Sequence, residues 1–285
     1  MRTLKISDKV FDLDKKTLII GVLNITPDSF SDGGRFLSID EAVKHAIQMQ
    51  KDGADIIDIG GESTRPGALP LSTSEELNRV IPVIEKLIKK IEIPLSIDTY
   101  KSEVAKKSFD LGVEMINDIT ALNGDKKLVN IVANYNVPIC LMHMKGNPRD
   151  MQNKAYYDDI IFEITNFLKE RAEYAMFNDV KKENIVIDPG LGFGKRTGRG
   201  IEDNCEILKH LSKLKTLKYP IIVGASRKTF IGNICGGEKP LPVEDRLEGS
   251  LAATIAAVIN GADIVRVHDV KETKRCIDII DCIIR

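Results

Sequence analysis

The chain has 285 residues, in which 41 lysines and arginines nearly balance 42 aspartates and glutamates, giving a net charge of −1. A chain without a basic excess lacks the positive surface that binds a phosphodiester backbone, so nucleic acid is excluded as a main partner. No apolar run approaches the roughly 20 residues that span a bilayer, and residues 1–5 lack the apolar core of a secretory signal. We therefore expect a cytoplasmic protein with no membrane partner.

The cysteines and histidines give no pattern typical of a metal site. Five cysteines occur without a C-x-x-C pair, at Cys140, Cys205, Cys235, Cys276 and Cys282. Their odd number and spacing predict reduced, mostly buried thiols rather than a disulfide framework or a zinc site. The four histidines, His143 among them, show neither H-x-H nor H-E-x-x-H spacing, so a histidine-based metal site is not expected.

The N-terminal residues 1–14 form a segment of their own. They alternate between polar and apolar side chains around Ser7 and Asp8, which predicts a β-hairpin that plugs the floor of the domain. We find no interdomain linker after this segment. Residues 1–285 are therefore predicted to form one domain, with the hairpin at 1–14 followed by the main fold at 17–285.

Eight short runs of apolar, largely β-branched residues follow the hairpin. They lie at 18–22, 56–59, 95–97, 115–116, 139–142, 185–187, 221–223 and 264–267. Each is too short and too continuously apolar for a half-exposed antiparallel strand, and the connections mostly carry a helical period. Eight such units predict the α/β class and a (β/α)8 TIM barrel. An open doubly wound sheet is the alternative, although it does not by itself require eight strands.

The connections contain start and stop signals for helices. Residues 38–41 (Ser-Ile-Asp-Glu) and 73–76 (Thr-Ser-Glu-Glu) both match the capping-box pattern ahead of an apolar period. Three connections end in the same type of turn, in which Gly53, Gly112 and Gly261 are expected to adopt the left-handed conformation. These repeated turns support the alternation of helices and strands.

The residues just after the eight runs are mostly charged, amide or hydroxyl side chains. In chain order they are Asn24, Glu62, Ser63, Thr64, Arg65, Asp98, Asn117, Asp118, His143, Asp188, Ser226, Arg227, Lys228, Arg266 and His268. Taken singly, Asp, Asn or Ser after a strand is often a turn former or a helix cap. Together they predict one site, because the carboxyl ends of barrel strands meet at the catalytic face.

These side chains meet two chemical demands. Asp98, Asn117 and Asp188 suit the edge of a flat heterocycle that presents amidine-like N–H donors. Positive charge for a phosphate or a departing diphosphate is offered by Arg65, Lys228, Arg266 and His268. Asn24 beside such a diphosphate is a predicted ligand of Mg²⁺, which takes few protein ligands and keeps several waters.

Two loops and one serine have sequences that exclude some chemistries and favour others. Residues 188–195 (DPGLGFGK) match neither nucleotide-binding glycine motif, and instead predict a loop whose backbone approaches a ligand. Residues 26–36 after the first strand are a candidate lid. Ser226 lacks the G-x-S-x-G elbow, so acyl transfer is not expected.

At these positions the sequence resembles the dihydropteroate synthase family of pterin-binding TIM barrels. Residues 21–34 (GVLNITPDSFSDGG) resemble its loop 1, and residues 58–67 (DIGGESTRPG) resemble its loop 2. Further similar stretches lie at 96–99, 143–148, 188–195, 226–228 and 266–269. The resemblance implies an enzyme that joins 6-hydroxymethyl-7,8-dihydropterin diphosphate to p-aminobenzoate in folate biosynthesis.

The resemblance also implies roles for individual residues. Asp98, Asn117 and Asp188 would bind the amino group and ring nitrogens of the pterin, and Lys228 its O4 and N5. Asn24 would ligate Mg²⁺, the implied cofactor. Arg266 and His268 would hold the diphosphate, with Thr64 and Arg65 beside both substrates. The p-aminobenzoate pocket would be walled by Phe30, Pro66, Phe193 and Thr229, the last at a position where the family often carries Ser.

The implied reaction needs a lid and allows alternatives. Asp28 and Asp32 are hypothesised to organise loops 1 and 2 as a lid that excludes water. A folate-dependent methyltransferase acting on a corrinoid would share the acids but has no use for the cations, and a non-catalytic paralogue would be expected to lose them. From the length, no bifunctional fusion is expected.

A homodimer is predicted, with apolar residues of the last helix at its interface or on the barrel wall: Ile279, Ile280, Ile283 and Ile284.

Overall fold

The computed structural model describes residues 2–25, 39–63, 67–147, 151, 155–196 and 202–285. Its strands are β1 (Thr3–Ile6), β2 (Lys9–Asp12), β3 (Leu18–Asn24), β4 (Ile56–Gly60), β5 (Leu95–Asp98), β6 (Met115–Asp118), β7 (Ile139–Met142), β8 (Ile185–Asp188), β9 (Ile222–Val223) and β10 (Ile264–Val267). Its α-helices are α1 (Ile39–Lys51), α2 (Thr73–Leu87), α3 (Ser102–Asp110), α4 (Leu128–Tyr135), α5 (Ile160–Phe177), α6 (Glu202–Lys209), α7 (Thr229–Gly236), α8 (Leu247–Ile259) and α9 (Val270–Ile284).

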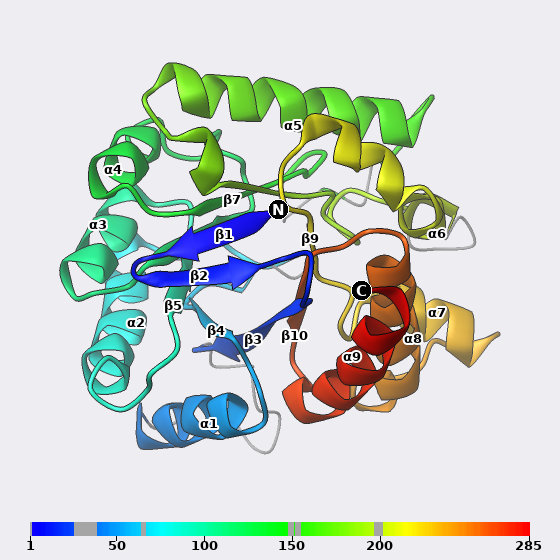
Figure 1. Cartoon of the computed structure of the whole chain (residues 1–285), viewed down its shortest axis with the longest axis horizontal. Helices are drawn as coiled ribbons and strands as arrows, with labels where there is room; N and C mark the ends of the chain where they lie inside the picture. Colours follow the sequence, from blue (N-terminus) through cyan, green and yellow to red (C-terminus); the bar gives the residue numbers. More distant parts are fainter. Residues whose placement is uncertain (1, 26–38, 64–66, 148–150, 152–154, 197–201) are drawn as a thin grey trace.

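The strands β3 to β10 form a parallel barrel, as the eight apolar runs predicted. Within the described residues they follow the order β8-β7-β6-β5-β4-β3-β10-β9, and a bridge between Ile187 and Ile221 closes the ring. The ring lies at the centre of Figure 1, with helices around it. The buried faces of the helices pack against the barrel wall, for example through Val80, Ile84 and Leu168. The predicted TIM barrel is confirmed.

The N-terminal hairpin β1–β2 covers one end of the barrel, where it crosses the ring of strands in Figure 1. Its strands pair antiparallel from Thr3 with Asp12 to Ile6 with Lys9. Leu4 and Ile6 are fully buried in a cluster with the first residues of the barrel strands, such as Leu18 and Ile264. The hairpin therefore closes the amino-terminal end of the barrel and leaves the carboxyl ends of the strands at the opposite end.

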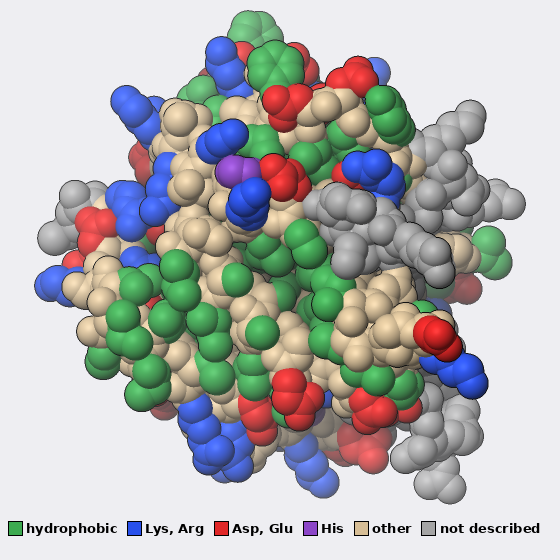
Figure 2. Space-filling model, turned by 90° about the vertical axis from the view of Figure 1, so that its right-hand side faces the viewer, with side chains coloured by type: hydrophobic (Ala, Val, Ile, Leu, Met, Phe, Trp, Pro, Cys, Tyr) green, Lys and Arg blue, Asp and Glu red, His purple; other side chains and the backbone are tan. Residues whose placement is uncertain are grey.

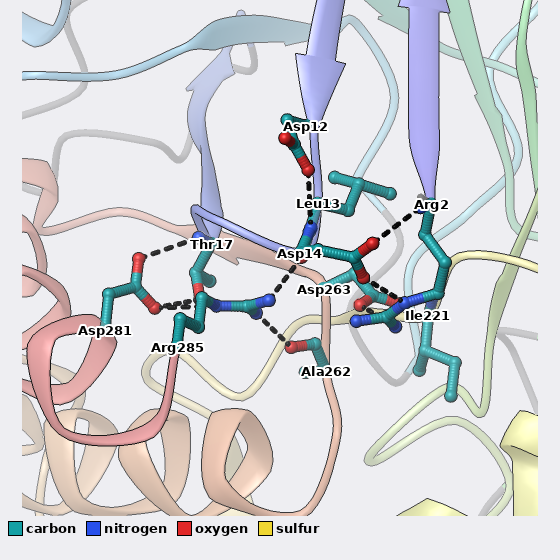
Figure 3. A network of polar contacts seen from close by, with 10 residues as sticks. All are labelled: Arg2, Asp12, Leu13, Asp14, Thr17, Ile221, Ala262, Asp263, Asp281 and Arg285. Atoms are coloured by element: carbon teal, nitrogen blue, oxygen red, sulfur yellow. Dashed lines mark hydrogen bonds and ion pairs between the residues drawn. The ribbon is translucent and has the colours of Figure 1, made fainter.

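Polar contacts bind the hairpin and the last helix to the part of the barrel where its first and last strands meet (Figure 3). Asp263, just before β10, accepts hydrogen bonds from Arg2 Nη1 at 2.6 Å and from the Ile221 amide at 3.0 Å. Arg285 donates to Leu13 O and, at 3.0 Å, to Thr17 Oγ1. These contacts connect the segments before β3, β9 and β10, and we call them the closing network.

The turns and caps match the sequence signals with one shift. Gly53, Gly112 and Gly261 have φ of 101°, 104° and 111°, as predicted for the three repeated turns. The capping box of α2 is formed by Ser72 and Glu75, one residue before the predicted pair at 73–76. The prediction was wrong because Ser72 and Thr73 are both good caps, and the backbone of Ser72 is the one that is extended. Ser38 lies outside the described residues.

The expectation of mostly buried cysteines was wrong. None of the five cysteines, all within the described residues, forms a disulfide, but Cys205, Cys235 and Cys282 are exposed, and Cys140 alone is buried. The exposed ones lie on helices α6, α7 and α9, on faces turned to the solvent. Among the described residues, no helix is long and apolar enough to cross a membrane.

Candidate active site

Three strands bring the predicted ring-binding side chains together at the carboxyl end of the barrel. Asp98 ends β5, and in the sheet it lies directly opposite Asn117 of β6. Asp188 ends β8, next to Met142 of β7. Asn117 and Asp188 are 6% and 5% exposed, so both side chains are buried. Asp188 is held by the Gly190 amide, which donates to its Oδ1 at 2.6 Å.

Arg266 of β10 extends across the barrel to two acids. Its Nε donates to Asp58 Oδ2 and its Nη2 to Asp98 Oδ2, both at 2.7 Å. Burial raises the pKa of Asp98 to about 7, with Arg266 opposing the rise and Asp58 adding to it. Arg266 therefore joins the acidic and the cationic sides of the site.

Lys228 stands at the N-terminus of α7, where it is the N-cap residue. Its Nζ lies 4.1 Å from the centroid of the Phe193 ring, a cation–π contact. Burial and the neighbouring charge of Arg266 lower the pKa of Lys228 to about 8, while Asp188 and Asp98 oppose that shift. With this pKa, Lys228 loses its positive charge only slightly above neutral pH.

His268 and Ser226 meet beside Arg266. Ser226 Oγ lies 3.0 Å from His268 Nδ1 and accepts from the His268 amide at 3.2 Å. Burial, with the positive charges of Arg266 and Arg227, lowers the pKa of His268 to about 3. At neutral pH the His268 ring is therefore neutral, and it provides a hydrogen-bonding group in place of the expected positive charge.

Asn24 ends β3 on the same rim. An added Cβ on Gly60 would lie 3.5 Å from Asn24 Oδ1 and 3.6 Å from Asp98 Cβ, so Gly60 leaves the two side chains close together. An amide oxygen beside a carboxylate matches the hard oxygen ligands that Mg²⁺ prefers. Within the described ranges no group of three or more His, Cys, Asp or Glu side chains forms a metal site. The Asn24 amide oxygen thus fits as a ligand of a hard cation.

A cavity of about 490 Å³ opens on the β4–β7 side of this rim. Ile119, Met144, Phe167 and Tyr100 give it mainly apolar walls, and Glu62 contributes a carboxylate. Phe193, predicted for the p-aminobenzoate pocket, is 8% exposed under Lys228, whereas Thr229 is exposed in the first turn of α7. Six predicted residues lie outside the described residues. They are Phe30 and Pro66 of that pocket, Asp28 and Asp32 of the lid, and Thr64 and Arg65 of the rim.

Several charged residues of this region were missed by the sequence reasoning. Asp58 lies inside the buried strand β4, and its Oδ1 has no hydrogen-bond partner among the described residues. The signal for it was an acid within an otherwise apolar run, Ile-Ile-Asp-Ile at 56–59. Lys195 is completely buried at the end of the glycine-rich loop, and Lys101 joins Glu62 to Glu76. No sequence pattern indicated these last contacts.

Comparison with known proteins gives a consistent result. The family model described as "Pterin binding enzyme" matches residues 20–268. A dihydropteroate synthase of Clostridium beijerinckii is 46% identical over 283 residues, 99% of this chain and 100% of the relative.

Two solved structures are similar over 99% of this chain and 98% of theirs. A Yersinia pestis dihydropteroate synthase in a sulfonamide drug complex has a TM-score of 0.92 at 40% identity. A Xanthomonas albilineans dihydropteroate synthase in complex with 7,8-dihydropteroate has a TM-score of 0.86 at 39% identity.

Proposed function

The chain belongs to the pterin-binding enzyme family, as do the dihydropteroate synthases that it resembles. We propose that it makes 7,8-dihydropteroate. The substrates are 6-hydroxymethyl-7,8-dihydropterin diphosphate and p-aminobenzoate, and the second product is diphosphate. The protein is thus a transferase of folate biosynthesis. The observation that carries the proposal is the meeting of Asp98, Asn117 and Asp188 with Lys228 and Arg266 at one end of the barrel.

The acidic side of the site binds the pterin ring. The ring presents its amino group and adjacent N–H as donors, and carboxylate and amide oxygens are matched acceptors in a poorly hydrated space. Asp98, Asn117 and Asp188 have this chemistry, and Lys228, whose charge interacts with Asp188 and Asp98, would donate to O4 and N5. An apolar neighbour such as Ile119 suits the face of the ring.

The cationic side stabilises the leaving group. In the substitution, the bond between the exocyclic methylene carbon and the diphosphate oxygen breaks, and the electron pair leaves with the diphosphate. Arg266 and Lys228 provide positive charge at that position, and His268 a hydrogen bond, with Arg65 and Thr64 assigned beside them. Charge that develops in an enclosed site is stabilised most by groups that are already in place, as Arg266 is.

Mg²⁺ is the proposed cofactor. Asn24 would hold it together with the substrate diphosphate and water, in line with the oxygen ligands on this rim. When bound, it would neutralise part of the charge on the departing diphosphate. The residues of the chain would hold the methylene carbon near the amine.

The arylamine then attacks the methylene carbon. The dihydropterin ring spreads the positive charge left on that carbon, so little general-base catalysis is needed, and the amine nitrogen, once bonded to the carbon, loses one proton to solvent. Phe193, with Phe30, Pro66 and Thr229, is proposed to wall the p-aminobenzoate. Asp28 and Asp32 are proposed to organise a lid that keeps water from capturing the cation.

The test is an assay of the purified protein with the pterin diphosphate, p-aminobenzoate and Mg²⁺. We expect dihydropteroate and diphosphate in equal amounts, and at least about a hundredfold loss in kcat/KM when Asp188 is replaced by Asn, because a charge-assisted hydrogen bond is lost. Omission of Mg²⁺ should lower turnover. A folded protein that binds a pterin but forms no product would contradict the proposal and favour a non-catalytic paralogue.

We further propose a homodimer formed through the face of α7, α8 and α9. Hydrophobic side chains are spread over this side of the molecule in Figure 2. The exposed ones include Ile259 of α8 and Ile279 and Ile283 of α9, the last two at 65% and 70% exposure. Ile279 and Ile283 are one helical turn apart, so they form one exposed apolar strip that suits burial against a second copy. Ile280, by contrast, belongs to the barrel wall.

Light scattering after size exclusion tests the dimer. An Ile279→Glu, Ile283→Glu double variant is expected to shift the mass to that of a monomer. Phe177→Glu on α5, which replaces a side chain that is 88% exposed on another helix, is the matched control and should keep the dimer. We place the enzyme in the cytosol, since exposed thiols such as Cys235 and Cys282 persist best in a reducing compartment.

A further inference from the structure

Lys195 is a buried lysine for which the proposed reaction has no use. It ends the glycine-rich loop that follows β8, and its side chain is 0% exposed. A fully buried lysine is uncommon, because its amine must lose its hydration and find partners within the protein. Burial lowers the pKa of Lys195 well below its ordinary value.

The partners of Lys195 all lie at the ends of two neighbouring strands. Its Nζ lies 2.8 Å from His143 Nδ1, and it donates to His143 O at 3.1 Å and to Pro189 O at 2.8 Å. His143 directly follows β7, and Pro189 directly follows β8. The His143 amide in turn donates to Asp188 O at 2.9 Å. One amine thus joins the ends of β7 and β8 on either side of Asp188.

The two loops approach each other so closely that glycine is required. An added Cβ on Gly190, whose φ is +68°, would lie 2.0 Å from His143 O. On Gly194, whose φ is +61°, it would lie 2.2 Å from Lys145 O. Backbone carbonyls packed in this way need donors, because a buried unpaired carbonyl is costly. Lys195 satisfies one carbonyl from each loop.

The loop that Lys195 closes carries two groups of the proposed site. Asp188 stands at its start, where the Gly190 amide orients the carboxylate. Phe193 lies two residues before Lys195, with its amide bonded to Gly190 O at 3.1 Å and its ring beneath Lys228. The position of the loop therefore sets the separation between Asp188, Phe193 and the Lys228 amine.

We propose that Lys195 is a positioning residue for pterin binding: by joining the ends of β7 and β8 with His143, it holds Asp188 and Phe193 in place. The inference rests on the proposed function, in which Asp188 binds the pterin. Lys195 itself does not touch the substrate. Its removal should loosen the pterin side of the site first, because Asp188 lies between its two anchor points.

The experiment measures the dissociation constant of 6-hydroxymethylpterin by the quenching of pterin fluorescence, together with kcat and both KM values. Lys195→Met keeps the length of the side chain and removes its hydrogen bonds. We expect the dissociation constant and the KM for the pterin diphosphate to rise about tenfold or more, with a smaller change in kcat. Wild-type pterin affinity in the folded Lys195→Met protein would overturn the proposal.

A second pair of variants decides the question if Lys195→Met does not fold. In His143→Asn an amide takes the place of Nδ1 and keeps a partner for Lys195, whereas His143→Leu removes it. Both variants lose the edge contact between the rings of His143 and Phe167, whose centroids lie 4.9 Å apart. The loss of this contact therefore does not contribute to a difference in binding between the two variants. Weaker pterin binding by His143→Leu but not His143→Asn supports the proposal, and equal binding by the two overturns it.

A parallel Asp188→Asn variant separates this inference from the proposed function. If the wild type binds the pterin and Asp188→Asn does not, the site assignment holds, and the Lys195 and His143 variants then test the positioning role alone. If Asp188→Asn binds like the wild type, the assignment of Asp188 fails, and the positioning role fails with it.

Discussion

The charge on Lys228 is set by its surroundings rather than by its side chain. Burial and Arg266 bring the pKa of this lysine to about 8, and Asp188 and Asp98 limit the shift. His268, two residues from Arg266, is held neutral for the same reason. The number of positive charges on the rim is therefore smaller at neutral pH than the number of basic residues.

The kcat/KM for the pterin diphosphate should therefore fall as pH rises through about 8. The protonated form of Lys228 is the one that donates to the pterin and stabilises the diphosphate, and above its pKa of about 8 that form is lost, about tenfold per pH unit. A pH profile from 7 to 9.5 at saturating Mg²⁺ and p-aminobenzoate measures the change.

Two variants accompany this profile. Lys228→Met should have a low kcat/KM without the decline at high pH, and Lys182→Met, which replaces an exposed lysine ahead of β8, should keep the wild-type profile. A wild-type profile that stays flat to pH 9.5 would show that Lys228 does not control this step.

At the scale of elements, β4, β5 and α2 are joined by one buried cation. Lys101, three residues after β5, bonds Glu62, which follows β4, and lies 2.5 Å from Glu76 Oε2 of α2. Glu76 is 1% exposed, and its Oε1 has no hydrogen-bond partner among the described residues. Lys101 therefore fixes the position of Glu62 just after β4 relative to α2.

Lys101→Met should destabilise the fold by about 3–5 kcal/mol, because it leaves two carboxylates without their cation in a poorly hydrated place. Urea unfolding followed by circular dichroism measures the change. Lys107→Met is the matched control on α3, since its ion pair with Glu103 lies on the exposed surface and should contribute little. Equal stabilities of the two variants would mean that the buried charges are solvated.

At the scale of the whole molecule, closure of the barrel depends on the segments before β9 and β10. The strand β9 has two residues, and an isolated bridge from Ile187 to Ile221, the residue just before β9, joins this place to β8. The closing network of Figure 3 reinforces this place, because Asp263 binds the Ile221 amide and Arg2 together. Residues more than 200 positions apart in sequence thus hold the barrel shut.

Asp263→Ala should lower the free energy of unfolding by about 2–4 kcal/mol, since it leaves the buried Ile221 amide unpaired and removes one of the two acids that bind Arg2. Hydrogen exchange should become faster at Ile221 and at the neighbouring strand ends. Asp14→Ala removes the exposed acid that also binds Arg2 and is expected to leave exchange at Ile221 unchanged. Slow exchange at Ile221 in Asp263→Ala would contradict this account of barrel closure.

The sequence by itself determined the secondary structure and the face that carries the site. Strand runs, the turns at Gly53, Gly112 and Gly261 and the polar residues after each run are local signals, because backbone conformation and alternation of burial depend on near neighbours. Parallel strands then bring their carboxyl ends together, so Asp98, Asn117 and Asp188 were predictable as a group.

The tertiary structure alone decided which charges pair and which side chains are ionised. Arg266 binds Asp58 across 208 positions of sequence, and Lys195 meets His143 across 52, and no local pattern records either contact. The same holds for His268: the sequence predicts a cation at this position, whereas its lowered pKa in the structure keeps the ring neutral. Ionisation depends on the loss of hydration and on the nearest charges, and both exist only once the barrel has closed.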